Sequence, residues 1–169
     1  MIATARLLIR PFRTAEAAEF FELSCDEGFR LHPITDYRQA DVQAAASWIA
    51  TASKLNQESG LGKWGVWGPD EADLLGMGGL TPWEFEGERM VDVTYRLRTS
   101  AWGKGLGLEL AQALVRWGFE RHRLPEITAT ITPDNEASRR IAQRLGMRFD
   151  RRITLLGTAT DLFRLAAQR

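Results

Sequence analysis

The chain has 169 residues, of which 44% are hydrophobic and 26% are charged, and its 22 basic side chains equal its 22 acidic ones. This length favours one domain over residues 1–169 with a sizeable core, and the zero net charge argues against nucleic acid as a partner. One cysteine and two histidines argue against a disulfide framework and a multi-histidine site, so no metal is expected. The chain lacks an apolar run near the ~20 residues of a membrane span and lacks a signal peptide, which predicts a cytoplasmic protein with no membrane partner.

The first half of the chain predicts a strand, two helices and three further strands. A short apolar run stopped by Pro11 indicates a strand over residues 5–10. Apolar spacing predicts a helix that begins near Thr14 and ends before Gly28, and another over 39–55, with a loop at 26–37. Strands are then expected at 63–67, 74–80 and 90–98, with turns at 69–73 and 84–88. Glycines within 74–80 indicate a bulge or a close approach of two backbones.

The second half begins with a glycine-rich loop that leads into a helix over residues 108–121. A β-branched run predicts a strand over 127–132, and Pro133-Asp134-Asn135 opens another helix that ends at Gly146. Closing strands are expected at 151–156 and 161–166, around a turn at Gly157. The order β-α-α-β-β-β-α-β-α-β-β predicts a mixed α/β sheet with helices on both faces.

The loop Trp102-Gly103-Lys104-Gly105-Leu106-Gly107 has the features of an anion site. Glycines allow positive φ and close backbone approach, and a helix N-terminus offers free N–H groups and the positive end of the helix dipole. The chain has no P-loop motif. A dinucleotide fingerprint fits poorly because Leu110 takes the third glycine position. A nucleotide-dependent oxidoreductase is therefore a weak alternative to a different phosphate ligand.

Five segments in the right order resemble the GNAT family of N-acetyltransferases, and within it the ribosomal-protein N-terminal acetyltransferases RimJ and RimL. They are Thr4 to Phe12, Leu75 to Leu80, Val91 to Leu97, Trp102 to Glu109, and Pro133 to Met147. The resemblance implies an α/β (α+β) GNAT fold, with a mixed, mostly antiparallel central sheet of about seven strands flanked by about four helices. It also implies that the fourth and fifth strands splay apart, and that the cofactor is acetyl-CoA.

The resemblance also implies which residues bind acetyl-CoA. The diphosphate would lie against the loop and helix start at Trp102, Gly103, Lys104, Gly105, Leu106, Gly107 and Leu108. The pantetheine arm would pair with exposed backbone groups of Tyr95, Arg96 and Leu97. Asn135 and Ser138 would hydrogen-bond the cofactor, with helix capping as their alternative role.

Acetyl transfer needs a group that accepts the amine proton and a group that protonates the departing thiolate. Many relatives use a tyrosine as the acid, and Ala142 takes that position here, which leaves Ser138 or a water for the role. Some relatives use a glutamate as the base where this chain has Thr130. Asp92 is the remaining candidate base, with an ordinary surface ion pair to Arg96 or Arg98 as its alternative role. Glu84 and His32 are further candidate bases.

The acceptor pocket is expected to contain Phe29, His32, Trp83 and Glu84, together with Tyr95. The sequence thus predicts transfer from acetyl-CoA directly to a primary amine in a ternary complex, since Cys25 has no evident partner for a covalent route. The amine belongs either to a protein N-terminus or to a small molecule. The alternative is a non-catalytic acyl-CoA sensor. The exact acceptor, the length of the acyl group and the oligomeric state, with a homodimer as one arrangement, stay open.

Overall fold

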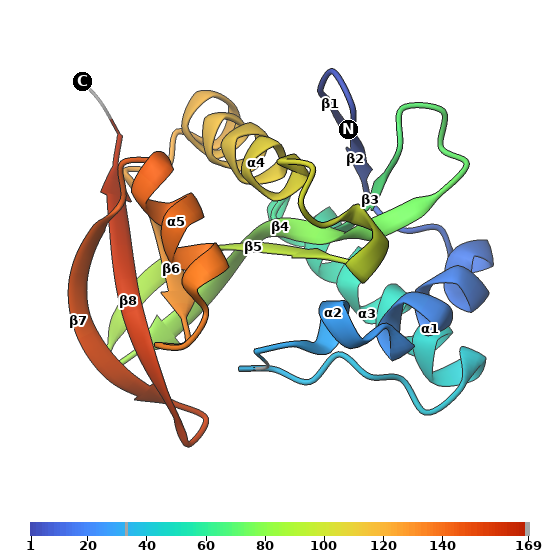
Figure 1. Ribbon diagram of the computed structural model, residues 1–169, viewed down its shortest axis with the longest axis horizontal. Helices are drawn as coiled ribbons and strands as arrows, with labels where there is room; N and C mark the ends of the chain where they lie inside the picture. Colours follow the sequence, from blue (N-terminus) through green and yellow to red (C-terminus); the bar gives the residue numbers. More distant parts are fainter. Residues whose placement is uncertain (33, 168–169) are drawn as a thin grey trace.

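One sheet runs through the part of the chain that the computed structural model describes, residues 1–32 and 34–167. Its strands are β1 (Ile2–Ala3), β2 (Leu8–Arg10), β3 (Gly62–Trp67), β4 (Leu74–Phe85), β5 (Glu88–Leu97), β6 (Glu126–Ile131), β7 (Arg148–Leu155) and β8 (Thr158–Ala166). They lie side by side in the order β1-β2-β3-β4-β5-β6-β8-β7 (Figure 1). Neighbouring strands are antiparallel except β5 and β6, which are parallel.

Helices cover both faces of this sheet, as predicted. They are α1 (Ala17–Cys25), α2 (Glu27–Arg30), α3 (Val42–Ser59), α4 (Leu106–His122) and α5 (Glu136–Arg144). In Figure 1, α4 lies above β4 and β5, whereas α1, α2 and α3 lie below them. Within the described residues, no helix combines the length and the apolarity that a membrane span requires.

The alternation of side chains along the strands produces two buried clusters. On the α4 face, Leu110 and Leu114 pack with Val66, Leu80 and Val93. On the opposite face, the second cluster contains aromatic and aliphatic side chains from α1, α3 and the sheet, among them Phe20, Ile49, Trp67 and Met77. Odd-numbered residues of β5 therefore face α4, and even-numbered residues face the other way.

The parallel neighbours β5 and β6 separate almost at once. In the described part of the chain they are paired at a single position, Asp92 with Thr128. Beyond it, residues 93–97 of β5 have no paired residue on the β6 side, while β6 continues its ladder with β8. This confirms the predicted splay, and it opens the sheet at its centre.

Several element bounds differ from the predictions for local reasons. The sheet has eight strands in the described residues because Ile2 and Ala3 add a short edge strand to β2. The strand expected to end at residue 80 continues to Phe85, because β4 and β5 stay in register up to a two-residue turn. That turn is Glu86-Gly87, with φ of 51° and 81°, as a type I′ hairpin requires.

Helix ends follow their capping residues. The Asp41 side chain accepts a hydrogen bond from the Ala44 N–H, so α3 begins at Val42 rather than at residue 39. The same helix continues to Ser59 and stops at Gly60, whose φ is 69°. The loop expected at 26–37 contains α2, which Asp26 caps through the Phe29 N–H.

Both features that the glycines of β4 indicated, a close approach of backbones and a bulge, are present. A Cβ atom at Gly79 would lie 1.8 Å from the carbonyl oxygen of Gly62 on β3. The bulge is in β4 as well: Val66 is opposite Gly76 and Trp67 is opposite Leu74, which leaves Leu75, next to Gly76, as the extra residue.

We predict that Gly79→Ala lowers the free energy of unfolding by about 3 kcal/mol or more, because the added methyl group pushes β3 away from β4. Urea unfolding followed by circular dichroism measures the loss. Gly68→Ala is the matched control, since its new Cβ would meet only Asp70 Oδ1, at an ordinary 3.4 Å. Equal stability of the two variants would contradict the proposed crowding.

Candidate active site

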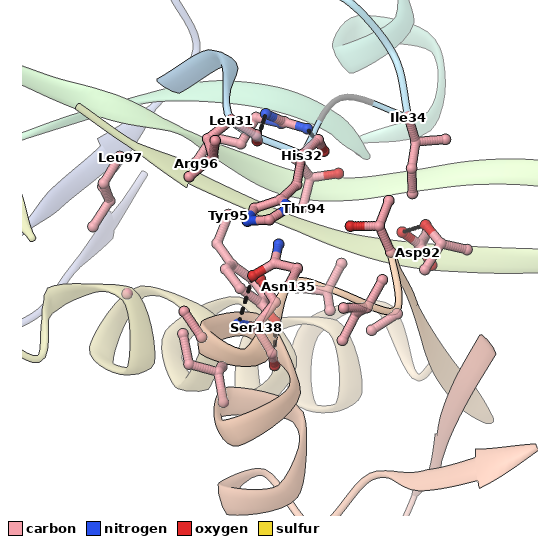
Figure 2. A pocket seen from close by; sticks show the side chains of 18 of the residues that line it. Leu31, His32, Ile34, Asp92, Thr94, Tyr95, Arg96, Leu97, Asn135 and Ser138 are labelled. Atoms are coloured by element: carbon pink, nitrogen blue, oxygen red, sulfur yellow. Dashed lines mark hydrogen bonds between the residues drawn. The ribbon is translucent and has the colours of Figure 1, made fainter. Parts of the chain in front are cut away.

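A cavity of about 1090 Å³ occupies the opening between β5 and β6. Its walls include Asp92 and Thr94 from one face of β5 and Val93 and Tyr95 from the other. Consecutive residues of a strand point to opposite faces, so one cavity can contact all four only where the strand edge is unpaired. The cavity therefore passes through the sheet, and Figure 2 shows side chains of β5 and α5 converging on it.

The glycine loop forms one end of this cavity. All of its predicted residues except Lys104 line the cavity, and so does Leu108 in the first turn of α4: Trp102, Gly103, Gly105, Leu106, Gly107 and Leu108. Gly103 and Gly105 have φ of 73° and 75°, and α4 begins without a side-chain cap. Uncapped N–H groups at a helix N-terminus form a site for an anion.

Contacts from outside the cavity hold this loop in place. The Arg6 guanidinium donates to the Lys104 carbonyl oxygen at 2.8 Å. The Glu109 carboxylate accepts from Thr4 Oγ1 at 2.6 Å and from Arg6 Nε at 2.7 Å. The Trp102 indole donates to the Leu97 carbonyl at 2.8 Å, which joins the loop to the end of β5. The loop is thus fixed before any ligand enters.

Lys104 itself is oriented toward the preceding turn. Its Nζ donates to the Ser100 carbonyl at 2.9 Å, and the residue does not belong to the cavity wall. Two arginines that the sequence analysis did not single out, Arg140 and Arg144, do line the cavity from α5. Their spacing of four residues places them on the same side of that helix, and this spacing was the available signal.

The N-terminus of α5 faces the centre of the cavity. The Asn135 side-chain oxygen accepts from the Ser138 N–H at 3.0 Å, so Asn135 does cap the helix. Its amide nitrogen points the other way, toward the cavity (Figure 2). Asn135 can therefore cap the helix and still offer two N–H donors to a ligand.

Tyr95 approaches the same helix from β5. Its hydroxyl donates to the Ser138 carbonyl at 3.3 Å. Burial raises the pKa of Tyr95 well above its usual range, so the phenol stays protonated at neutral pH. Ala142, the position where many relatives have a tyrosine, is fully buried. The cavity thus contains a phenol that comes from a strand rather than from the last helix.

Asp92 lies at the other end of the cavity, where β5 meets β6. Its two carboxylate oxygens accept hydrogen bonds from Thr128 Oγ1 and Thr130 Oγ1, both at 2.9 Å. Burial raises the pKa of Asp92 to about 6, against the opposing effect of these hydrogen bonds. A carboxylate of this pKa is mostly ionised at neutral pH and can accept a proton.

The surface ion pair with Arg96 or Arg98, the alternative role expected for Asp92, is not formed within the described residues. Arg96 instead donates to the carbonyl oxygens of Phe29, Leu31 and His32, at 2.8, 3.1 and 3.0 Å. It thereby anchors the segment after α2 over the cavity. Thr130, where some relatives have a glutamate, acts here as a donor to Asp92.

The predicted acceptor residues divide into two groups. His32 lines the cavity and its Nδ1 lies 3.3 Å from Asp134 Oδ2, and Trp83 lines it with its indole nitrogen 3.4 Å from Thr128 Oγ1. Phe29 and Glu84 lie elsewhere. The Phe29 ring is 1% exposed within the second buried cluster, because α2 turns it inward, and Glu84 is an exposed residue beside Arg89.

Comparisons with known proteins agree with this geometry. A family model for the acetyltransferase (GNAT) domain matches residues 6–148. The uncharacterized protein YkkB of Bacillus subtilis (strain 168) is 26% identical over 113 residues, which cover 67% of this chain and 66% of that protein. The uncharacterized N-acetyltransferase YoaA of the same organism is 28% identical over 147 residues, 86% of this chain and 81% of that one.

Solved structures share the fold. RimL, a ribosomal alpha-N-protein acetyltransferase determined in complex with coenzyme A, has a TM-score of 0.82 at 16% identity, over 96% of this chain and 95% of that one. The family model covers most of the chain, including both splayed strands, the glycine loop and α5. The chain therefore belongs to the GNAT family of acetyltransferases.

Proposed function

We propose that this chain transfers an acetyl group from acetyl-CoA directly to a primary amine while both are bound in one cavity. The observation that supports the proposal most strongly is that a single cavity extends from the glycine loop to the Asp92 carboxylate. Membership of the GNAT acetyltransferase family supports the reaction. The RimL structure, which contains coenzyme A, supports the donor, and its name supports an amine acceptor.

The residues present fit such a donor. The uncapped start of α4, with its glycines at positive φ, suits a diphosphate, and Arg140 and Arg144 add positive charge along the same wall. The unpaired edge of β5 at Tyr95 to Leu97 and the Asn135 amide suit the amide groups of a pantetheine arm. Acetyl-CoA would supply the acetyl group as an activated thioester.

At the acceptor end, Asp92 acts as the base. The two threonine hydroxyls hold the Asp92 carboxylate in one orientation. Burial brings the pKa of this carboxyl closer to neutral pH, which makes Asp92 a stronger base than an ordinary aspartate. An incoming ammonium group would be attracted to this carboxylate. Once the ammonium has released its extra proton to solvent, the amine would pass one proton to Asp92 as the C–N bond forms. His32 and Trp83 lie on the wall around this position.

Two hydroxyls are candidates for the acid, those of Tyr95 and Ser138. Both belong to residues on the cavity wall. We favour Tyr95, because its phenol is protonated at neutral pH and is oriented by the Ser138 carbonyl. A phenol is also a stronger acid than an aliphatic hydroxyl.

A non-catalytic sensor of acyl-CoA is the second candidate function. Ala142 favours it, since the tyrosine that many relatives use as an acid is missing. Thiol release from acetyl-CoA in the presence of a panel of primary amines separates the two functions. A sensor would bind coenzyme A and release no thiol with any amine, whereas the proposed enzyme releases thiol in proportion to acetylated product.

We predict that Gly105→Glu weakens coenzyme A binding by at least about 100-fold, because it adds a negative charge to the loop that would hold the diphosphate. Isothermal titration calorimetry measures the affinity. Gly105→Ala is the control, since it imposes the same backbone strain at φ 75° without a charge. Unchanged affinity in folded Gly105→Glu protein would remove the loop as the diphosphate site.

We predict that Tyr95→Phe lowers kcat about 100-fold, since the acid for the departing thiolate is lost. Coenzyme A affinity should stay within about twofold, because the ring and its packing are retained. Steady-state thiol release gives kcat, and Ser138→Ala serves as the matched variant. A normal rate in Tyr95→Phe with a large loss in Ser138→Ala would transfer the acid role to Ser138.

A further inference from the structure

A row of polar side chains crosses the sheet beneath the acceptor end of the cavity. It comprises Lys63 on β3, Thr81 on β4, Asp92 on β5, and Thr128 and Thr130 on β6. Thr81 is directly opposite Asp92, and Asp92 is opposite Thr128, while Lys63 is opposite Gly79, two residues before Thr81. Directly opposed residues share a face of the sheet, so all five belong to the face that carries the second buried cluster.

This polar row continues a face that is apolar at its other end. Trp67 and Met77 lie on the same face and are covered by α1 and α3. Toward Lys63 and Asp92 the cavity takes the place of the helices, and Tyr37 from the loop after α2 faces it. The change from apolar to polar residues therefore coincides with the edge of the cavity rather than with the surface of the molecule.

Lys63 is the one cation of the row, and it has spare hydrogen-bonding capacity for an anion. Its Nζ donates to Thr81 Oγ1 at 3.1 Å and lies 5.7 Å from the centre of the Tyr37 ring. Within residues 1–32 and 34–167, no carboxylate lies within ion-pair distance of it. An ammonium group has three donors, so at least two remain for a ligand.

The other cation near this end is already occupied. The Arg96 guanidinium donates to three backbone carbonyls of the segment after α2. Both oxygens of Asp92 accept from threonines, and its charge lies close enough to Lys63 for the lysine to lower the pKa of that carboxyl. A half-buried ammonium group that faces the cavity without a paired carboxylate in the described part of the chain is free to bind the anionic group of a ligand.

The diphosphate of the donor is too distant to be that anion. The glycine loop follows the Leu97 end of β5, and Asp92 lies five residues back along the strand, about 16 Å away at the usual rise per residue. The Lys63 backbone lies two strands to the side, level with Thr94. Its ammonium group is directed away from the loop, to Thr81 opposite Asp92. The anion that Lys63 would bind therefore belongs to the acceptor.

We propose, on the basis of the proposed function, that the acceptor is a primary amine that also carries a carboxylate, with the amine at Asp92 and the carboxylate on Lys63. Neighbouring strands lie about 4.8 Å apart, so two strand spacings separate the two residues, and the lysine side chain leans toward Thr81 between them. The two charged groups of the acceptor are thus a few bonds apart. A free amino acid and a peptide with an acidic first residue share this chemistry.

Acetyl transfer to such an acceptor makes one bond and breaks one bond, and every proton has a donor and an acceptor. The amine nitrogen forms a C–N bond with the acetyl carbon, and the C–S bond of the thioester breaks. One amine proton passes to Asp92, and the sulfur gains a proton from the acid of the site. The carboxylate of the acceptor takes no part in bond making and serves to orient the amine.

Matched acceptors test the proposal. The probes are alanine against alaninamide, and the C-terminally amidated dipeptides Glu-Ala against Gln-Ala, with each rate referred to the concentration of unprotonated amine. In at least one pair we expect the carboxylated member to have a kcat/KM roughly 10- to 100-fold higher, the usual effect of a hydrogen bond to a charged group. A preference in the alanine pair would identify a free amino acid as the acceptor, and a preference in the dipeptide pair would identify a peptide with an acidic first residue.

Lys63→Gln should remove that preference, so that the kcat/KM values of the two members of a pair come within about threefold of each other, whatever change both undergo through the pKa of Asp92. Lys54→Gln, an exposed lysine on α3 that faces Glu58 at 4.0 Å, is the matched control and should keep the preference. Equal rates for both members of both pairs would overturn the proposal. So would a Lys63→Gln variant that slows both members equally and keeps the preference, because the lysine would then act through Asp92.

Failure of the proposed function gives a different result. If the neutral amines support thiol release and the carboxylated amines have no higher kcat/KM, the acetyltransferase function is supported and the carboxylate site is excluded. If no amine releases thiol, calorimetry of the same four probes against the coenzyme A-saturated protein decides. Lys63-dependent binding of the carboxylated probes then supports the carboxylate site in a sensor, and absence of binding overturns it.

Discussion

Strand pairing between β5 and β6 stops after one residue pair, Asp92 with Thr128, and the site depends on that interruption. A fully paired sheet would separate the two faces, and the donor loop on the α4 side would have no connection to the polar row on the other. With the pairing interrupted, Tyr95 and Asp92 open into one cavity although they point to opposite faces. The same interruption leaves backbone groups of residues 93–97 on β5 available to hydrogen-bond a ligand.

The electrostatics follow from this geometry. At one end, helix N–H groups and arginines favour an anion, and at the other end a carboxylate of raised pKa favours an amine. The raised pKa is a consequence of burial where the two strands part. Sequence changes that exposed Asp92 to solvent would lower the pKa of that carboxyl toward its ordinary value, and with it the basicity proposed here.

Features that are contiguous in the sequence could be predicted from it. The glycine loop, the helix that follows it and the Asn135 cap are each encoded within a few residues, and the family resemblance supplied the splayed strands. Lys63, by contrast, approaches the site through the register of β3 with β4, which no local pattern specifies. Phe29 is expected from the sequence in the acceptor pocket and lies instead in the second buried cluster, where α2, capped by Asp26, replaces the expected loop.

The pH dependence of kcat/KM tests most directly the claim that Asp92 is the base at the acceptor end. In the native protein, kcat/KM for a fixed concentration of unprotonated amine should rise with pH through about 6, as Asp92 loses its proton. In Asp92→Asn the rate at neutral pH should fall at least about 100-fold, and the inflection near pH 6 should vanish while coenzyme A affinity is retained. An Asp92→Asn enzyme with the native inflection and rate would contradict the claim.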